Sequence, residues 1–262
     1  MFVGSEDAKV IIQGYAITGI TDVSFNSTVE EKAVVLLADR GINRKVNNGH
    51  TVECKISKSY LGKDRLQEFT GITNLSGQFI YGTNAVEFDQ AAVTSYSISA
   101  DATSSPKVSV TIKIFGDFKP TTSIQAGLAD YSFENLGPES TFINVENRNS
   151  LLTNFSYNVN FDVQPTYEIS STKATTSRIQ SPIKYSTSAD MLMDEQEFVD
   201  LTGLMESETF NRNVTFNMQN ESSTVLNTYN IPNASISSQS ASVTAGDLVK
   251  MSVKYQGLEL NV

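Results

Sequence analysis

The sequence contains no tryptophan, one cysteine (Cys54) and one histidine (His50). A single cysteine excludes an intrachain disulfide. A structural zinc site takes about four Cys or His ligands, so these two residues cannot build one, and we expect neither a metal nor a cofactor. No apolar run approaches the roughly 20 residues of a membrane helix. The amino-terminal stretch also lacks the basic and apolar regions of a secretory signal.

Motifs that indicate enzymatic chemistry are also missing. The chain has no G-x-G-x-x-G, Walker-type or G-x-S-x-G pattern. We expect His50 to be an exposed hairpin residue rather than a catalytic base, and Cys54 to be a buried thiol on the inner face of a strand. The net charge of −10 disfavours unaided binding to a phosphate backbone. We therefore predict that the protein is not an enzyme.

Alternating strands dominate what is present, and Ser, Thr and Asn are abundant. The stretch 93–116 predicts two strands joined by a small polar turn, and the stretch 231–257 repeats this pattern. A period of two over seven or more residues is typical of a half-buried strand. The predicted core-facing positions of the two second strands are Val108, Val110, Ile112 and Ile114, followed by Val249, Met251, Val253 and Tyr255.

Several local patterns give further expectations. Asn48-Gly49 predicts a two-residue hairpin turn, and the stretch 82–84 predicts another turn. A short helix is expected within residues 59–69, and a second one is expected to begin at Ser188 as its N-cap. Glycines at positions 14 and 19 are expected to break the first strands.

The order of these elements repeats along the chain. Lys55 matches Lys184 at a separation of 129 positions, and Lys113 matches Lys254 at a separation of 141. A separation that grows while the order is kept is what small loop insertions produce in a duplicated domain. We therefore predict an all-β fold of two tandem β-sandwich or barrel domains, each with one short helix. The domains span residues 1–118 and 149–262, and an ordered connector spans residues 119–148.

This element order resembles the tail tube protein of tailed bacteriophages, whose fold is shared with the inner tubes of contractile injection systems. The resemblance rests on an early long hairpin loop, a short helix (SYLGKDRLQEF, SADMLMDEQEF) and a closing pair of long strands. It implies a structural virion protein, assembled in the host cytoplasm. Three chains would form a pseudo-hexameric ring, and stacked rings would form a conduit through which DNA passes during genome ejection without specific binding.

The resemblance also implies which residues make contacts between chains. The two closing strand pairs would belong to the ring sheets, and the long loops 29–48 and 165–180 would contact the adjoining ring. The inter-ring residues that it implies are Glu30, Glu31, Lys32, Arg40, Arg44, Lys45, Lys173 and Arg178. Two alternatives remain open at this point. One is another virion component, such as a tail terminator, neck, baseplate or capsid decoration protein, and the other is a two-domain β-sandwich adhesin.

Overall fold

The chain is almost entirely β-structure, as the sequence predicts. The computed structural model describes residues 8–35, 42–101, 103–128, 142–145, 151–168, 171, 173–193, 212–219, 222, 224–242 and 249–260. In these residues, 14 strands form one connected antiparallel sheet, and the single helix has four residues. For brevity we call residues 8–121 the first half and residues 142–260 the second half.

The first half contains eight strands and the helix. Their bounds are β1 (Ala8–Ile12), β2 (Tyr15–Ile17), β3 (Ile20–Val35), β4 (Ile42–Ser59), α1 (Arg65–Glu68), β5 (Leu75–Tyr81), β6 (Asn84–Asp101), β7 (Ser104–Ile114) and β8 (Phe118–Thr121). Gly14 and Gly19 adopt positive φ angles of 80° and 72° at the breaks between the first three strands. Glycine adopts this left-handed conformation without steric cost, which explains why the predicted breaks fall there.

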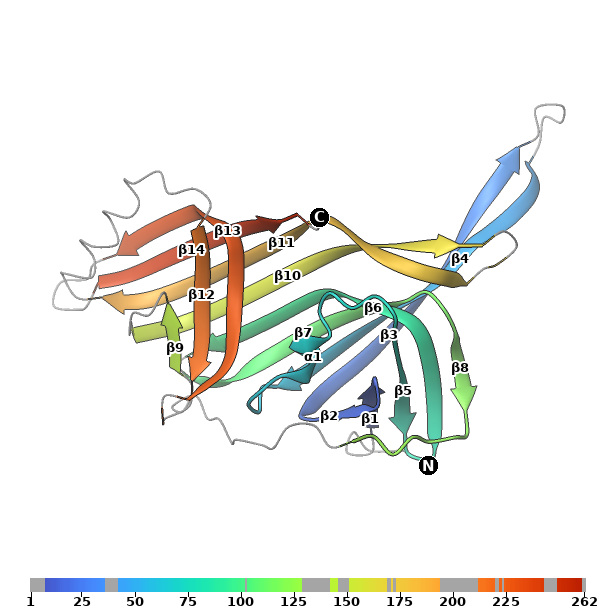
Figure 1. The fold of residues 1–262 in the computed structure, drawn as a ribbon, viewed down its shortest axis with the longest axis horizontal. Coiled ribbons are helices and arrows are strands. Elements are labelled where there is room, and N and C mark those ends of the chain that lie inside the picture. The colour runs from blue at the N-terminus through green and yellow to red at the C-terminus, as the bar shows by residue number, and fades with distance from the viewer. Residues whose placement is uncertain are drawn as a thin grey trace.

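The second half contains six strands. Their bounds are β9 (Phe142–Val145), β10 (Leu151–Tyr167), β11 (Ala174–Met193), β12 (Arg212–Gln219), β13 (Val225–Ser242) and β14 (Val249–Glu259). In Figure 1, β10 and β11 cross much of the molecule, and the β3–β4 hairpin projects away from the other strands at one end. Both predicted closing strand pairs are confirmed, because β6 pairs with β7 and β13 pairs with β14.

Strand pairing follows the same order in the two halves. In the first half the order is β1–β5–β6–β7–β4–β3, and in the second half it is β9–β12–β13–β14–β11–β10. The two series join where β6 pairs with β10, in an antiparallel ladder running from Asn154 opposite Asp101 to Asn160 opposite Ser95. One ladder thus makes the sheet continuous between the halves.

The predicted turn at Asn48-Gly49 is wrong. The strand β4 runs through both residues, and the register of its pairing with β3 shifts there, between Val29 opposite His50 and Glu31 opposite Asn47. The extra residues are accommodated as a bulge, which an Asn-Gly sequence tolerates as well as a turn. The strands β3 and β4 are therefore the arms of a single long hairpin, and the predicted loop 29–48 consists largely of these arms.

The helix predicted to begin at Ser188 is also wrong at its start. Ser188 lies within β11, opposite Ser156 of β10 and Lys254 of β14. A strand with hydrogen-bonded neighbours on both sides is favoured over the local helix signal, because tertiary pairing overrides propensity. The rest of that prediction, from residue 194, lies outside the described residues. The helix predicted within residues 59–69 is confirmed in shorter form as α1, with Asp64 as its N-cap.

The main hydrophobic core contains residues from both halves. Core-facing residues of β4 and β7 in the first half, such as Cys54 and Ile112, belong to the same buried cluster as Phe216 and Tyr255 of the second half. Burial raises the pKa of the Cys54 thiol to about 12, so it stays protonated at neutral pH. The prediction of a buried thiol is confirmed.

Candidate assembly interface

The strands predicted to belong to ring sheets have the expected inner faces. Val108, Val110, Ile112 and Ile114 of β7 are all buried, as are Met251, Val253 and Tyr255 of β14, and Val249 is half-buried. Both strands lie inside the sheet, because β7 has β4 and β6 as neighbours and β14 has β11 and β13. Their lateral edges are therefore already paired within the chain.

The charged residues predicted as inter-ring contacts lie on the two long hairpins. Glu30, Glu31 and Lys32 belong to β3, and Arg44 and Lys45 belong to β4, with side chains outside the described part of the chain. Arg40 lies outside the described residues altogether. Arg178 is an exposed residue of β11, opposite Gln164 of β10.

Lys173, also predicted as an inter-ring contact, forms an ion pair within the chain. It lies just before β11 and contacts Asp117, which also pairs with Lys119 at 3.6 Å. The hydrogen bond from Lys173 lowers the pKa of the Asp117 carboxyl from its usual value. Next to this pair, the Ala174 N–H donates to the Phe115 carbonyl at 2.9 Å, so the end of the β10–β11 hairpin docks on the first half.

A second contact between the halves lies under the β6–β10 ladder. Tyr96 of β6 is fully buried, its ring stacks on that of Tyr229 of β13 with centroids 6.5 Å apart, and Tyr157 of β10 packs on the same ring at 5.0 Å. The helix α1 adds a hydrogen bond from the Gln67 amide to the Thr228 carbonyl at 3.0 Å. We call these contacts, together with the β6–β10 ladder, the internal junction.

A buried polar cluster stabilises the internal junction. The Asp64 carboxylate accepts from the Lys58 ammonium at 3.0 Å, from the Tyr96 hydroxyl at 2.8 Å and from the Leu66 N–H at 3.2 Å. Burial, and then the nearby Asp64 charge, raise the pKa of Tyr96 well above its usual value, so its hydroxyl keeps its proton and donates it. Nothing in the polar sequence around Asp64 indicates this burial.

The strands β6 and β13 share an unusual kink. Gln90 in β6 and Asn233 in β13 both have left-handed backbone conformations, with φ angles of 48° and 49°, and a positive φ is uncommon for residues other than glycine. Four residues further on, the Thr94 hydroxyl donates to the Thr111 carbonyl at 3.3 Å, and the Ser237 hydroxyl donates to the Lys254 carbonyl at 3.2 Å. Gln90 and Asn233 therefore occupy the same position in their strands.

The β3–β4 and β10–β11 hairpins also correspond. Residues 36–41 connect the first pair of strands and residues 168–173 connect the second, so Val35 and Tyr167 occupy matching positions. Their lateral neighbours differ. In the described residues β10 pairs with β6 as well as with β11, whereas β3 pairs only with β4. Similarly, residues 95–101 of β6 have strands on both sides, whereas residues 235–242 of β13 pair only with β14.

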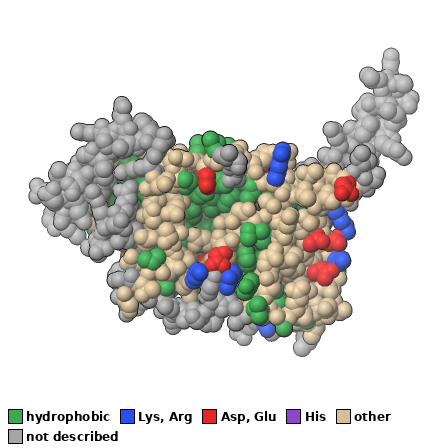
Figure 2. Space-filling view, viewed as in Figure 1, with side chains coloured by type: hydrophobic (Ala, Val, Ile, Leu, Met, Phe, Trp, Pro, Cys, Tyr) green, Lys and Arg blue, Asp and Glu red, His purple; other side chains and the backbone are tan. Residues whose placement is uncertain are grey.

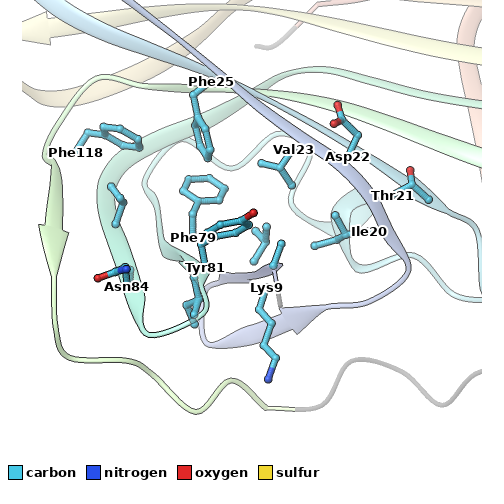
Figure 3. A pocket seen from close by; sticks show the side chains of 15 residues that line it. Lys9, Ile20, Thr21, Asp22, Val23, Phe25, Phe79, Tyr81, Asn84 and Phe118 are labelled. Carbon is cyan, nitrogen blue, oxygen red and sulfur yellow. The ribbon is translucent and has the colours of Figure 1, made fainter. Parts of the chain in front are cut away.

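The inner face of β3 borders an apolar cavity of about 600 Å³ that opens to solvent. Figure 3 shows Val23 and Phe25 of β3 on one side of it, with Phe79 and Phe118 facing Phe25. The Phe25 ring meets Phe79 edge-on at 4.7 Å, yet 47% of Phe25 remains exposed. Phe155, Tyr157 and Val159 on the inner face of β10 are all buried.

The face of the sheet opposite the core carries many hydroxyl and amide side chains, together with exposed lysines such as Lys107, Lys250 and Lys254. Its carboxylate Asp190 accepts from the Ser252 hydroxyl at 2.5 Å and from the Asn154 amide at 3.3 Å, and the Ser156 and Ser188 hydroxyls bond to each other at 2.7 Å. The side of the molecule shown in Figure 2 displays hydrophobic side chains gathered in a hollow, with small groups of acidic and basic side chains around it.

No model of a protein family matches the chain, and a search of curated proteins finds no match. Among the described residues, no helix is long and apolar enough to cross a membrane. Nor does any group of three or more His, Cys, Asp or Glu side chains in the described ranges have the geometry to hold a metal ion.

Proposed function

We propose that this chain is a structural protein of the phage tail tube type, which assembles into rings that stack into a conduit for DNA. In this proposal the two halves are tandem copies of one domain, three chains form a pseudo-hexameric ring, and the protein belongs to the virion tail. It has no catalytic role, and DNA passes through without specific binding.

The observation that carries the proposal is how the edges of the sheet pair. One pair of edges joins the two halves within the chain, and two further edges stay open. The halves have the same strand order and are joined through β6 and β10. In the described residues, the corresponding edges are unpaired on one side, since residues 235–242 of β13 pair only with β14 and β3 pairs only with β4. An unpaired edge is a liability in a monomer. Two open edges at opposite ends of a repeated unit suit head-to-tail association, which generates a ring when the rotation between units closes.

The polar face of the sheet is suited to line a channel. Its hydroxyl and amide groups are hydrogen-bonded to one another, as in the cluster around Asp190, Ser252 and Asn154. Phosphate binding depends chiefly on clustered Lys and Arg, and the chain as a whole has a net charge of −10. In this proposal, the net negative charge of the chain opposes retention of a polyanion by the lysines of this face, such as Lys107, Lys250 and Lys254.

The test is direct imaging of the purified protein at increasing concentration. Negative-stain electron microscopy should show hollow tubes or rings, and sedimentation velocity should show a species of three chains or multiples of three. A protein that remains monomeric at the highest accessible concentration would contradict the proposal. Retention of duplex DNA by the assembled rings at physiological salt would contradict the proposed passive channel.

A further inference from the structure

We infer that the β3–β4 hairpin of one copy lies along the β13 edge of a second copy and that the cavity beside Phe25 closes in that contact. The inference identifies the partner as another copy of the same chain and specifies the register. It rests on the structural likeness of the halves, and it deepens the proposed function without requiring that the rings stack into a tube.

The internal junction provides the template for this contact. Within one chain, the β10–β11 hairpin lies along β6, with Val159 opposite Tyr96. The matching hairpin is β3–β4, and the strand matching β6 is β13. Counting from the matched hairpin ends, Val35 and Tyr167, makes Ser27 the counterpart of Val159. Counting from the shared kink at Gln90 and Asn233 makes Gln239 the counterpart of Tyr96. The predicted register therefore places Ser27 of one copy opposite Gln239 of the other.

The side chains along the β13 edge support the same pairing. Tyr96 fills the internal junction and donates to Asp64, whereas its counterpart Gln239 has a buried side-chain oxygen with no hydrogen-bond partner. A buried polar atom without a partner is uncommon in native structures. In the proposed contact, Gln239 lies next to β3 and the cavity of the second copy.

A second position of the second half, Leu258, is exposed, whereas its counterpart in the first half, Phe115, is covered. Phe115 lies four residues after Thr111, is 3% exposed and is covered by the end of the β10–β11 hairpin at Ala174. The equivalent hydrogen bonds match Lys254 to Thr111, so the predicted match of Lys254 to Lys113 is wrong by two positions. Leu258 lies four residues after Lys254 and is 52% exposed. A β3–β4 hairpin arriving in the same way would cover Leu258. The hairpin ends would then meet a neighbour in the same ring, rather than the adjoining ring that the resemblance implies.

The cavity beside Phe25 in the first half corresponds to a region of the second half that is filled by side chains. It is bordered by Asn84 and Val86 of β6, which lie as far before Gln90 as Asn227 and Tyr229 lie before Asn233. In the second half, Tyr96 of the first half stacks on Tyr229, and Gln67 of α1 donates to the Thr228 carbonyl between these two positions. In the proposed contact, the second half of another copy covers these positions of the first half in the same way.

Cysteine cross-linking tests the register. The double variant Ser27→Cys/Gln239→Cys should form disulfide-linked multimers on oxidation, because directly opposed strand residues have Cβ atoms about 4.5–5.5 Å apart. The matched control Thr21→Cys/Gln239→Cys uses the same strands six positions out of register and should give no multimers. The native Cys54 is buried and should remain unreactive. No multimers from the first variant, or equal amounts from both, would overturn the inference.

A charge in the cavity provides an independent test. Phe25→Asp should leave the monomer folded, because this side chain is half exposed, and should raise the concentration needed for half-maximal assembly about tenfold or more. Ile72→Asp, at a position 42% exposed outside the cavity, should leave assembly unchanged. Tubes without the Ser27–Gln239 cross-link would sink this contact and leave the proposed function standing. Cross-linked rings that never stack would support this contact and contradict the proposed tube.

Discussion

Replacing Asp64 by the isosteric Asn should destabilise the protein more than an Asp→Asn or Glu→Gln change at any exposed described position. The carboxylate and its partner Lys58 are 0% and 3% exposed, and the asparagine would leave the lysine charge buried without a counter-ion. Breaking a buried pair in this way costs about 3–5 kcal/mol. For a chain of this size, each kcal/mol lowers Tm by roughly 2–4 °C, so the expected drop is on the order of 10 °C.

A double-mutant cycle separates the ion pair from the rest of the cluster. Lys58→Met leaves Asp64 its hydrogen bonds from the Tyr96 hydroxyl and the Leu66 N–H, so this variant should lose less stability than Asp64→Asn. The combined variant removes both charges and should recover much of the loss, with a coupling energy of about 1–3 kcal/mol. The free energies of unfolding are measured by urea denaturation of dilute protein, followed by far-UV circular dichroism. A loss below about 1 kcal/mol for Asp64→Asn would refute a charged, buried pair.

Three further perturbations test the fold. Val110→Lys places a charge at a fully buried position of β7 and should abolish soluble expression, whereas Ser109→Lys on the exposed face should be tolerated; a folded Val110→Lys protein would show that the strand register is wrong. Gly257→Ala should cost roughly 1–3 kcal/mol in chemical denaturation, because the added Cβ would lie 2.4 Å from the Pro232 carbonyl oxygen, and an unchanged midpoint would contradict this. Hydrogen bonds from Ser104, then Thr103, lower the pKa of the exposed Asp101 from 3.8 to about 2. The contribution of Asp101 is therefore complete above about pH 4 and lost as pH falls towards 2, which an NMR titration of its carboxyl should show and an unshifted titration would refute.

Local alternation was enough to predict the strands but not how the sheet is joined. The inner rows of β7 and β14 were readable because a half-buried strand alternates polar and apolar residues. The β6–β10 ladder was not readable, because its outer positions are small polar residues, Ser and Asp in β6 and Asn and Ser in β10. Nothing in such a composition selects one partner strand over another.

The two wrong local predictions have one physical cause. Asn48-Gly49 and the segment beginning at Ser188 both carry strong short-range signals, for a turn and for a helix start. In the structure both lie inside long strands: β4 pairs with β3 on either side of Asn48-Gly49, and β11 pairs with β10 and β14 around Ser188. The pairing of many residues outweighs a preference of about 1 kcal/mol at a cap or turn. The burial of Asp64 and Lys58 was missed for a related reason, since its partners Tyr96 and Tyr229 are distant in sequence.

The internal junction also indicates how strongly two copies should associate. It contains the seven residue pairs from Asn154 opposite Asp101 to Asn160 opposite Ser95. Cross-strand pairs contribute about 0.2–1 kcal/mol each, so a ladder of this length gives a few kcal/mol. Association of separate chains costs about 4–15 kcal/mol in lost freedom of motion, a cost that the two halves of one chain do not meet. Edge pairing alone would therefore leave the chains largely monomeric, and the burial of Phe25 and Leu258 must supply the difference. Assembly should consequently be more sensitive to these two apolar side chains than to any polar residue of the β3 or β13 edge.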